Sequence, residues 1–127
     1  MRHRKTKLLV VDDTEAVRKS IAYYFKEKGF AVFTAASGEE SLPIIIGQRP
    51  EIMLADITLP QMNGIELVKL VRQFNKTIKV IFISAEIENF KNNPQLKQLD
   101  IFAFLDKPPD FFELESLVKK ALMQVEK

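Results

Sequence analysis

The sequence predicts an α/β domain in which helices cover both faces of a parallel β-sheet. Five short apolar runs alternate with stretches of helical periodicity, and such alternation is typical of strand–helix–strand units. The chain has 127 residues, which suits a single domain with a sizeable core. Because no internal linker or repeat interrupts the pattern, we expect one continuous domain.

The five apolar runs have the length of strands, and the first four contain β-branched or aromatic residues. Runs one, three and four are continuously apolar, which favours strands that are buried on both faces of the sheet. The predicted strands are Leu8–Val11, Ala31–Phe33, Ile52–Ala55, Val80–Ile83 and Ile101–Leu105.

The first two helices are predicted from periodicity and from their end signals. Three apolar residues at a spacing of four indicate a first helix, and Gly29 is its natural C-cap: the three are Val17, Ile21 and Phe25. Ser37 and Glu40 have the spacing of a capping box, which predicts the start of the second helix. Pro43 falls inside that pattern and is expected to kink or restart the helix.

Three further helical segments follow. The third helix has one apolar face, formed by Ile65, Val68 and Val71. Pro94, beside two asparagines, is expected to shorten or break the fourth helix. Pro109 is expected to start the last helix, with Asp110 in its first turn. The apolar stripe of this helix is Phe111, Leu114, Leu117, Val118, Ala121, Leu122 and Val125.

Composition excludes several classes of function. The chain has no cysteine, which removes disulfides and thiolate sites and is compatible with a cytoplasmic location. Its single histidine, His3, lies in a polar terminus and supplies neither a catalytic triad nor a histidine-rich metal site. No apolar run approaches the length of a membrane span, and neither a signal peptide nor a nucleic-acid-binding motif is present.

The positive charge is concentrated at the N-terminus. The formal net charge is +2, but four basic residues precede or begin the first strand, namely Arg2, Arg4, Lys5 and Lys7. Without them, 15 basic residues face 17 acidic ones, so the remainder is slightly acidic. We therefore expect a flexible basic arm over residues 1–6 and the folded domain over residues 7–127.

Polar residues follow four of the five predicted strands. Asp12 and Asp13 come after the first strand, Asp56 after the third, Ser84 after the fourth, and Lys107 after the fifth. In a doubly wound sheet these strand ends share one edge, where ligands bind. Clustered carboxylates without histidine or cysteine favour a hard cation, and Mg²⁺ fits best. A carboxylate beside such an ion can act as a nucleophile toward a phosphoryl group.

Four segments resemble the receiver domains of response regulators, the phosphoacceptor domains of two-component systems typified by CheY. They are residues 8–13 (LLVVDD), 56–67 (DITLPQMNGIEL), 80–85 (VIFISA) and 104–108 (FLDKP). The second segment is the most specific, because it is long and ungapped. The resemblance implies a flavodoxin-like, doubly wound (βα)5 three-layer sandwich with a five-stranded parallel sheet of order 2-1-3-4-5.

The resemblance also implies the role of each polar residue. Asp56 is the phosphoacceptor. Mg²⁺ is bound directly by Asp13, through water by Asp12, and by the backbone carbonyl of Thr58. Ser84 and Lys107 contact the phosphoryl group once it is formed.

Three further features are implied for the segment after the fourth strand. Phe104 is the switch aromatic, which moves inward when Ser84 is drawn toward the phosphate. Phe102 is expected on the same strand face. The Lys107–Pro108 peptide bond is expected to be cis.

The partners implied by the family are a sensor histidine kinase or a histidine phosphotransfer protein, and a downstream protein or a fused output domain. The signalling face comprises the fourth helix, the fifth strand and the last helix, and is also a potential homodimer face. The residues do not identify the kinase or decide between a stand-alone protein and part of a longer regulator. The function is that of a signalling switch rather than an enzyme, and neither nucleic acid nor membrane is an expected partner.

Three other functions remain as alternatives. A hydrolase of the haloacid dehalogenase type needs an aspartate two residues after its nucleophile, but Thr14 and Glu15 stand at those positions after Asp12 and Asp13. A nucleotide or flavin module needs a glycine- or hydroxyl-rich loop where this chain has acids. A phosphorylation-independent pseudo-receiver would share the fold, and activation by a phosphodonor with Mg²⁺ separates it from the main prediction.

Overall fold

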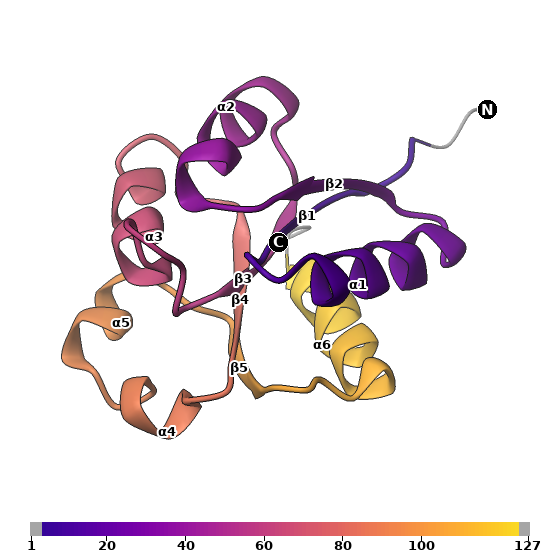
Figure 1. Ribbon diagram of the computed structural model, residues 1–127. Coiled ribbons are helices and arrows are strands. Elements are labelled where there is room, and N and C mark those ends of the chain that lie inside the picture. Colours follow the sequence, from indigo (N-terminus) through magenta and orange to yellow (C-terminus); the bar gives the residue numbers. More distant parts are fainter. Residues whose placement is uncertain (1–3, 125–127) are drawn as a thin grey trace.

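The structure is a computed structural model and describes residues 4–124. Five parallel strands form one sheet of order β2-β1-β3-β4-β5, as predicted (Figure 1). The strands are β1 (Lys7–Val11), β2 (Ala31–Ala35), β3 (Ile52–Asp56), β4 (Lys79–Ser84) and β5 (Ala103–Asp106). All five residues of β3 are buried, as expected for the central strand of a sheet that is covered on both faces.

Helices cover the two faces of the sheet, and each face has its own core cluster (Figure 1). On one face, α1 (Glu15–Glu27) and α6 (Phe111–Met123) pack against alternate residues of the strands. The other face carries α2 (Gly38–Gln48), α3 (Gly64–Arg72), α4 (Ile87–Phe90) and α5 (Pro94–Gln98). The result is a helix–sheet–helix sandwich in which helices cover the two faces of the sheet.

Most predicted helix ends are confirmed. Gly29, at φ +95°, follows the end of α1. The Ser37 hydroxyl accepts a hydrogen bond from the Glu40 N–H at the start of α2. The Glu40 carboxylate accepts from the Ala36 N–H at 2.9 Å, one residue before the donor that a capping box uses.

The three prolines behave differently. Pro94 occupies the first turn of α5 and separates it from the four-residue α4, so the predicted break is confirmed. Pro43 was expected to kink or restart the second helix, but α2 continues through it without a restart. The prediction for Pro109 is wrong: Asp110 is the N-cap of α6, and its carboxylate accepts from the Glu113 N–H. An N-cap carboxylate satisfies a free backbone donor, and α6 therefore starts at Phe111, two residues after Pro109.

The fifth strand starts later than predicted. It begins at Ala103, so Phe102 precedes the strand and packs against the α1–α6 cluster, whereas Phe104 packs against the opposite cluster. The expectation that both rings share one strand face is therefore wrong. Strand alternation applies only inside the ladder, and Phe102 lies outside it.

The two chain ends are described only in part. Within the predicted basic arm, Arg2 and His3 lie outside the described residues, and so does Val125 of the last apolar stripe. The Arg4 guanidinium pairs with the Glu51 carboxylate at 2.7 Å, which ties that part of the arm to the start of β3. Within residues 4–124, no helix combines the length and apolar character needed to cross a membrane.

Candidate functional site

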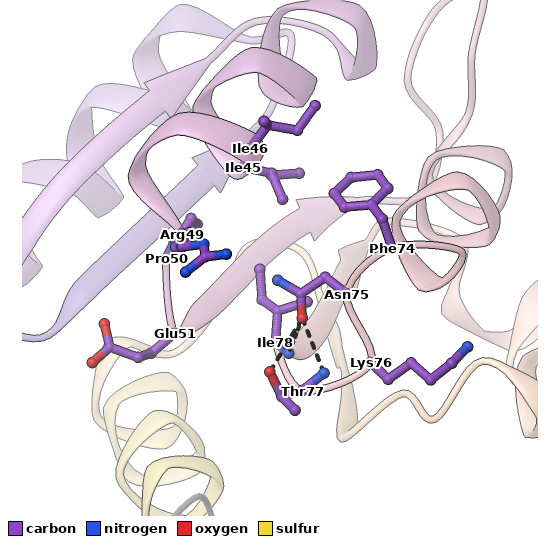
Figure 2. A pocket seen from close by; sticks show the side chains of 10 residues that line it. All are labelled: Ile45, Ile46, Arg49, Pro50, Glu51, Phe74, Asn75, Lys76, Thr77 and Ile78. Atoms are coloured by element: carbon purple, nitrogen blue, oxygen red, sulfur yellow. Dashed lines mark hydrogen bonds between the residues drawn. The ribbon is translucent and has the colours of Figure 1, made fainter.

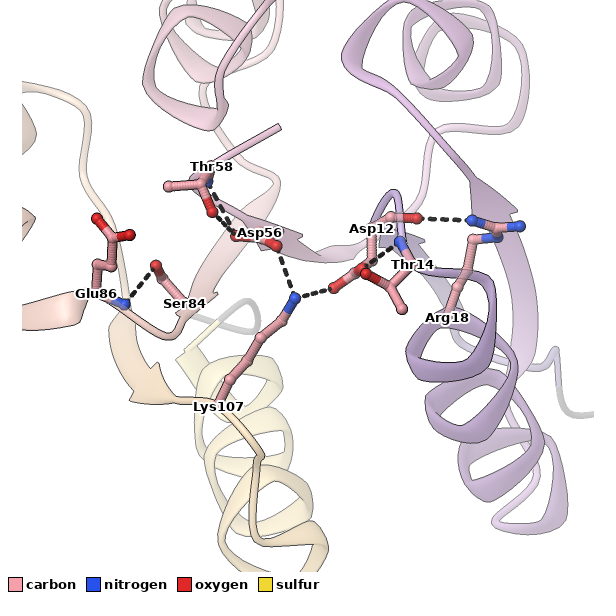
Figure 3. A network of polar contacts seen from close by, with 8 residues as sticks. All are labelled: Asp12, Thr14, Arg18, Asp56, Thr58, Ser84, Glu86 and Lys107. Carbon is pink, nitrogen blue, oxygen red and sulfur yellow. Dashed lines mark hydrogen bonds and ion pairs between the residues drawn. The ribbon is translucent and has the colours of Figure 1, made fainter. Parts of the chain in front are cut away.

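The predicted polar residues meet at the C-terminal edge of the sheet (Figure 3). Asp12 follows β1, Asp56 ends β3, Ser84 ends β4, and Lys107 follows β5. Parallel pairing of β1, β3, β4 and β5 brings these positions together from across 96 residues of sequence. The cleft is therefore a product of topology rather than of local sequence.

Three carboxylates form the acidic part of the cleft. Asp12, Asp13 and Asp56 each present an oxygen atom, and these atoms lie within 4.8 Å of one another. Asp12 and Asp56 are 3% and 4% exposed, whereas Asp13 is exposed. Three neighbouring carboxylates repel one another, and the two buried ones are costly to ionise without a cation beside them.

Lys107 supplies positive charge to the two buried carboxylates. Its Nζ lies 2.8 Å from Asp12 Oδ2 and 2.7 Å from Asp56 Oδ2. Burial alone would lower the pKa of Lys107, but hydrogen bonds and charge from both aspartates outweigh burial and raise it. The amine therefore stays protonated in the cleft. The peptide bond to Pro108 is cis, as predicted.

Loop donors hold the second oxygen of each buried carboxylate. Asp12 Oδ1 accepts from the Thr14 N–H at 2.8 Å. Asp56 Oδ1 accepts from both the N–H and the hydroxyl of Thr58, each at 2.9 Å. Each carboxylate thus directs Oδ2 toward Lys107 and Oδ1 toward its own loop. The contact between the Thr58 hydroxyl and Asp56 was not predicted from the sequence.

Ser84 is buried beside the cleft but does not contact the carboxylates. Its hydroxyl accepts from the Glu86 N–H at 3.0 Å, and its carbonyl accepts from the Lys107 N–H at 3.1 Å. The second contact fixes the Lys107 backbone against the end of β4. The loop after β4 and the loop after β5 are therefore linked at the edge of the cleft.

Phe104 lies on β5, three residues before Lys107. It is half-buried, and its ring centroid is 6.1 Å from that of Phe82, its register partner on β4. Phe82 is fully buried, so one side of the Phe104 ring packs on the core. The strand that carries Phe104 also contacts α4.

Two residues near the cleft have contacts that the sequence did not indicate. Arg18 Nη1 donates to the Asp12 carbonyl at 2.8 Å, which holds the start of the loop against α1. Gly64 is the first residue of α3. A Cβ at Gly64 would lie 2.8 Å from the Asp56 carbonyl oxygen, so only glycine fits against the backbone there.

The donor set of the cleft fits a hard divalent cation. The three neighbouring carboxylates offer oxygen ligands only, and that is the chemistry Mg²⁺ prefers. The exposed Asp13 leaves one side of the cluster open to solvent, as suits an ion that retains several waters.

Comparisons with known proteins agree with this geometry. Residues 8–119 match the family model described as the response regulator receiver domain. The chain is 35% identical over 118 residues to sporulation initiation phosphotransferase F of Bacillus subtilis (strain 168), covering 91% of this chain and 93% of that protein. It is 32% identical to the alkaline phosphatase synthesis transcriptional regulatory protein PhoP of the same organism, covering 94% of this chain but 50% of that protein.

Solved structures give the same result. A CheY-like response regulator receiver domain protein from Methanospirillum hungatei JF-1 superimposes with a TM-score of 0.90. The match covers 97% of this chain and 98% of that one, at 26% identity.

Proposed function

The chain belongs to the response regulator receiver domains, and we propose that it acts by accepting a phosphoryl group on Asp56 with Mg²⁺ bound beside it. Receiver domains are signalling switches of two-component systems. The observation that carries the proposal is the bridge from Lys107 to two buried carboxylates beside a third. Such a cleft combines a nucleophile with fixed positive charge.

We assign the metal to Asp12, Asp13, Asp56 and the backbone carbonyl of Thr58. The first three already present oxygens within 4.8 Å of one another. Thr58 lies two residues after Asp56 in the same loop. Its N–H and its hydroxyl both donate to the Asp56 carboxylate and so hold this loop next to the cleft. When bound, Mg²⁺ supplies positive charge that offsets the three carboxylates and the oxygens of the phosphoryl group.

The transfer step uses Asp56 as the nucleophile. A carboxylate oxygen forms a bond to phosphorus while the phosphorus–nitrogen bond of the donor phosphohistidine breaks, and the released imidazole takes a proton from solvent. Lys107, which is 2.7 Å from Asp56 Oδ2 before the reaction, then pairs with an oxygen of the new phosphoryl group. Thr58 continues to donate to the aspartyl group from the other side.

The switch proceeds through Ser84. To reach the phosphoryl group, its hydroxyl exchanges the Glu86 N–H contact for a hydrogen bond in which it is the donor. This exchange draws the loop after β4 toward the cleft and opens space for the half-buried ring of Phe104. The change reaches the face made by α4, α5, β5 and α6, where it alters binding to a downstream partner or output domain, or homodimer formation.

We propose that the donor is a sensor histidine kinase or a histidine phosphotransfer protein. Support comes from the relatives: one is named a phosphotransferase, and another is a transcriptional regulatory protein of which this chain spans half the length. A reaction with such donors, together with the absence of cysteine, supports a cytoplasmic location.

The proposal is tested by intact mass after incubation with acetyl phosphate, with and without Mg²⁺. We expect the wild type to gain one phosphoryl group only when Mg²⁺ is present, and Asp56→Asn to gain none. Asp100→Asn is a matched control, because it neutralises an exposed aspartate remote from the cleft. No gain in the wild type would favour a phosphorylation-independent interaction module. A gain that persists in Asp56→Asn would mean that another residue is the phosphoacceptor.

A further inference from the structure

A cavity of about 480 Å³ lies at the edge of the sheet opposite the acidic cleft (Figure 2). It is bounded by the C-terminal ends of α2 and α3 and by the residues that precede β3 and β4. Its volume falls within the usual range for sites that bind small molecules. The phosphoacceptor chemistry makes no use of this cavity.

One wall of the cavity is apolar. Ile45 is buried at its base, whereas Ile46 and Phe74 are 62% and 52% exposed at its rim. Ile46 comes from α2 and Phe74 from the turn after α3, and both line the cavity (Figure 2). Exposed apolar side chains that converge on a concave surface are a feature of ligand sites.

Hydrogen-bond donors line the other wall. The Asn75 side-chain oxygen accepts from the Thr77 N–H, the Thr77 hydroxyl and the Ile78 N–H. The amide nitrogen of Asn75 is thereby turned toward the cavity, where the Arg49 guanidinium also points (Figure 2). Within residues 4–124 this guanidinium has no hydrogen bond or ion pair.

The backbone of Arg49 places its side chain next to the cavity at the end of α2. Arg49 follows the end of α2 at φ +54°, in the left-handed region that favours glycine or asparagine. Arg49 carries one of the two cationic side chains that line the cavity. The other, Lys76, already donates to the Arg72 carbonyl at 2.9 Å.

The charges of the cavity favour a monoanion. Glu51 also lines it, but its carboxylate already accepts from Arg4 at 2.7 Å and from the Lys7 N–H at 2.9 Å. Burial would raise the pKa of Glu51, but these contacts outweigh it and keep the group ionised. A dianion such as a phosphate monoester would meet more repulsion from Glu51 than a carboxylate would.

We propose that this cavity binds a small carboxylate with an aromatic or branched apolar body. The apolar body lies against Ile46 and Phe74, and the carboxylate accepts hydrogen bonds from Arg49 and Asn75. The cavity and Asp56 are at opposite ends of the five-residue β3, roughly 15 Å apart. The cavity shares no residue with the acidic cleft, so binding there goes beyond the proposed function.

The test is a titration of the full chain, followed through its backbone amide NMR signals. The probes are 2-naphthoate, its neutral analogue 2-naphthamide, and 2-naphthyl phosphate. The variants are Arg49→Gly, which removes the cation and relieves the backbone, and Phe74→Ser, which removes the exposed ring. Lys97→Gln, an exposed cation on α5, is the control.

We expect saturable shifts from 2-naphthoate that are confined to residues 45–51 and 74–78. Arg49→Gly should lower the affinity for 2-naphthoate by about tenfold or more and leave the affinity for 2-naphthamide unchanged. Phe74→Ser should lower the affinity for both of these probes, and Lys97→Gln should change neither affinity. The wild type should bind 2-naphthyl phosphate less tightly than 2-naphthoate. The proposal is overturned by shifts that do not saturate, by equal affinity in Arg49→Gly, or by tighter binding of the phosphate.

Discussion

The amine of Lys107 stands between two carboxylates that are almost completely buried. We expect Lys107→Met to lower the free energy of unfolding by about 1–3 kcal/mol, because it leaves two adjacent charges without their donor. Mg²⁺ should restore part of the loss, since it binds only the folded cleft. Urea unfolding with and without Mg²⁺ measures both effects.

The matched control for Lys107 is Lys119→Met. Lys119 makes an exposed ion pair with Glu115 at 3.2 Å on α6, and such pairs contribute little, about 0–1 kcal/mol. If Lys107→Met were as stable as the wild type without Mg²⁺, the cleft would not depend on this amine.

The raised pKa of Lys107 also sets a direction for the pH dependence of stability. The folded-state pKa lies above the ordinary 10.5, so folding favours the protonated amine. Its stabilising contribution is fully present below pH 10.5 and is lost as pH rises through the folded-state pKa. The stability difference between wild type and Lys107→Met should therefore be constant at neutral pH and narrow in strongly alkaline solution.

Gly64 limits which side chains can fit beside the backbone of Asp56. In Gly64→Ala the new Cβ would lie 2.8 Å from the Asp56 carbonyl oxygen and 2.9 Å from Ile57 Cα, both in the backbone. We expect Gly64→Ala to lower the free energy of unfolding by about 1–3 kcal/mol, because the loop that carries Asp56 must shift. For the same reason we expect slower phosphorylation by acetyl phosphate.

Gly47→Ala is the opposite case among the glycines. No atom lies within 4 Å of a Cβ at Gly47, which is in the last turn of α2. Alanine there should raise the free energy of unfolding by up to about 1 kcal/mol. A loss of stability in Gly47→Ala that equals the loss in Gly64→Ala would rule out the close contact as the cause.

At the scale of the elements, α2 tolerates a proline that the sequence pattern predicted would disrupt it. Pro43 lacks the N–H that would donate to the Glu39 carbonyl, yet the helix runs from Gly38 to Gln48. Because Pro43 is exposed, Pro43→Ala should raise the free energy of unfolding by about 2 kcal/mol. Thermal unfolding checks this, and an unchanged melting temperature would mean that packing already compensates for the missing bond.

The segment before β5 departs from the usual receiver pattern without losing its anchorage. The guanidinium of Arg72, at the end of α3, donates to the carbonyls of Ile78, Leu99 and Asp100. Asp100 adopts φ +58°, a left-handed conformation that favours glycine. Arg72 thus ties the short α5 to the start of β4, and the interrupted fourth helix does not displace β5.

On the scale of the whole molecule, the sheet separates two apolar clusters that must form together. Phe25 is fully buried between α1 and the sheet, so Phe25→Ala should cost about 3–5 kcal/mol, a large part of the stability of a small domain. Phe112, on the outer surface of α6, is 81% exposed, and Phe112→Ala should stay within about 0.5 kcal/mol.

Chemical denaturation followed by far-ultraviolet circular dichroism compares the two phenylalanine variants. The denaturation midpoint of Phe25→Ala should fall far below that of the wild type, while Phe112→Ala should match it. Similar midpoints for the two variants would contradict the assignment of Phe25 to the core.

The whole molecule also divides its chemistry between the two edges of the sheet. The C-terminal edge holds the acidic cleft, and the N-terminal edge holds the cavity beside Arg49. Parallel strands make this division inevitable, because every strand contributes its end to the same edge.

The sequence by itself determined the fold class, the helix start at Ser37, the break at Pro94, and the five polar residues of the cleft. These features depend on periodicity and on neighbours within a few residues, which a single sequence contains in full. Even the convergence of Asp12, Asp56 and Lys107 follows once the strands are taken as parallel, because the ends of parallel strands share one edge.

Only the tertiary structure decided how those residues are used. It buried Asp12 and left Asp13 exposed, brought the hydroxyl of Thr58 to Asp56, and placed Phe102 and Phe104 in opposite clusters. Such outcomes depend on where a strand begins to within one residue and on distances between groups far apart in the chain. Local patterns do not encode those distances, because they arise from the packing of all the elements at once.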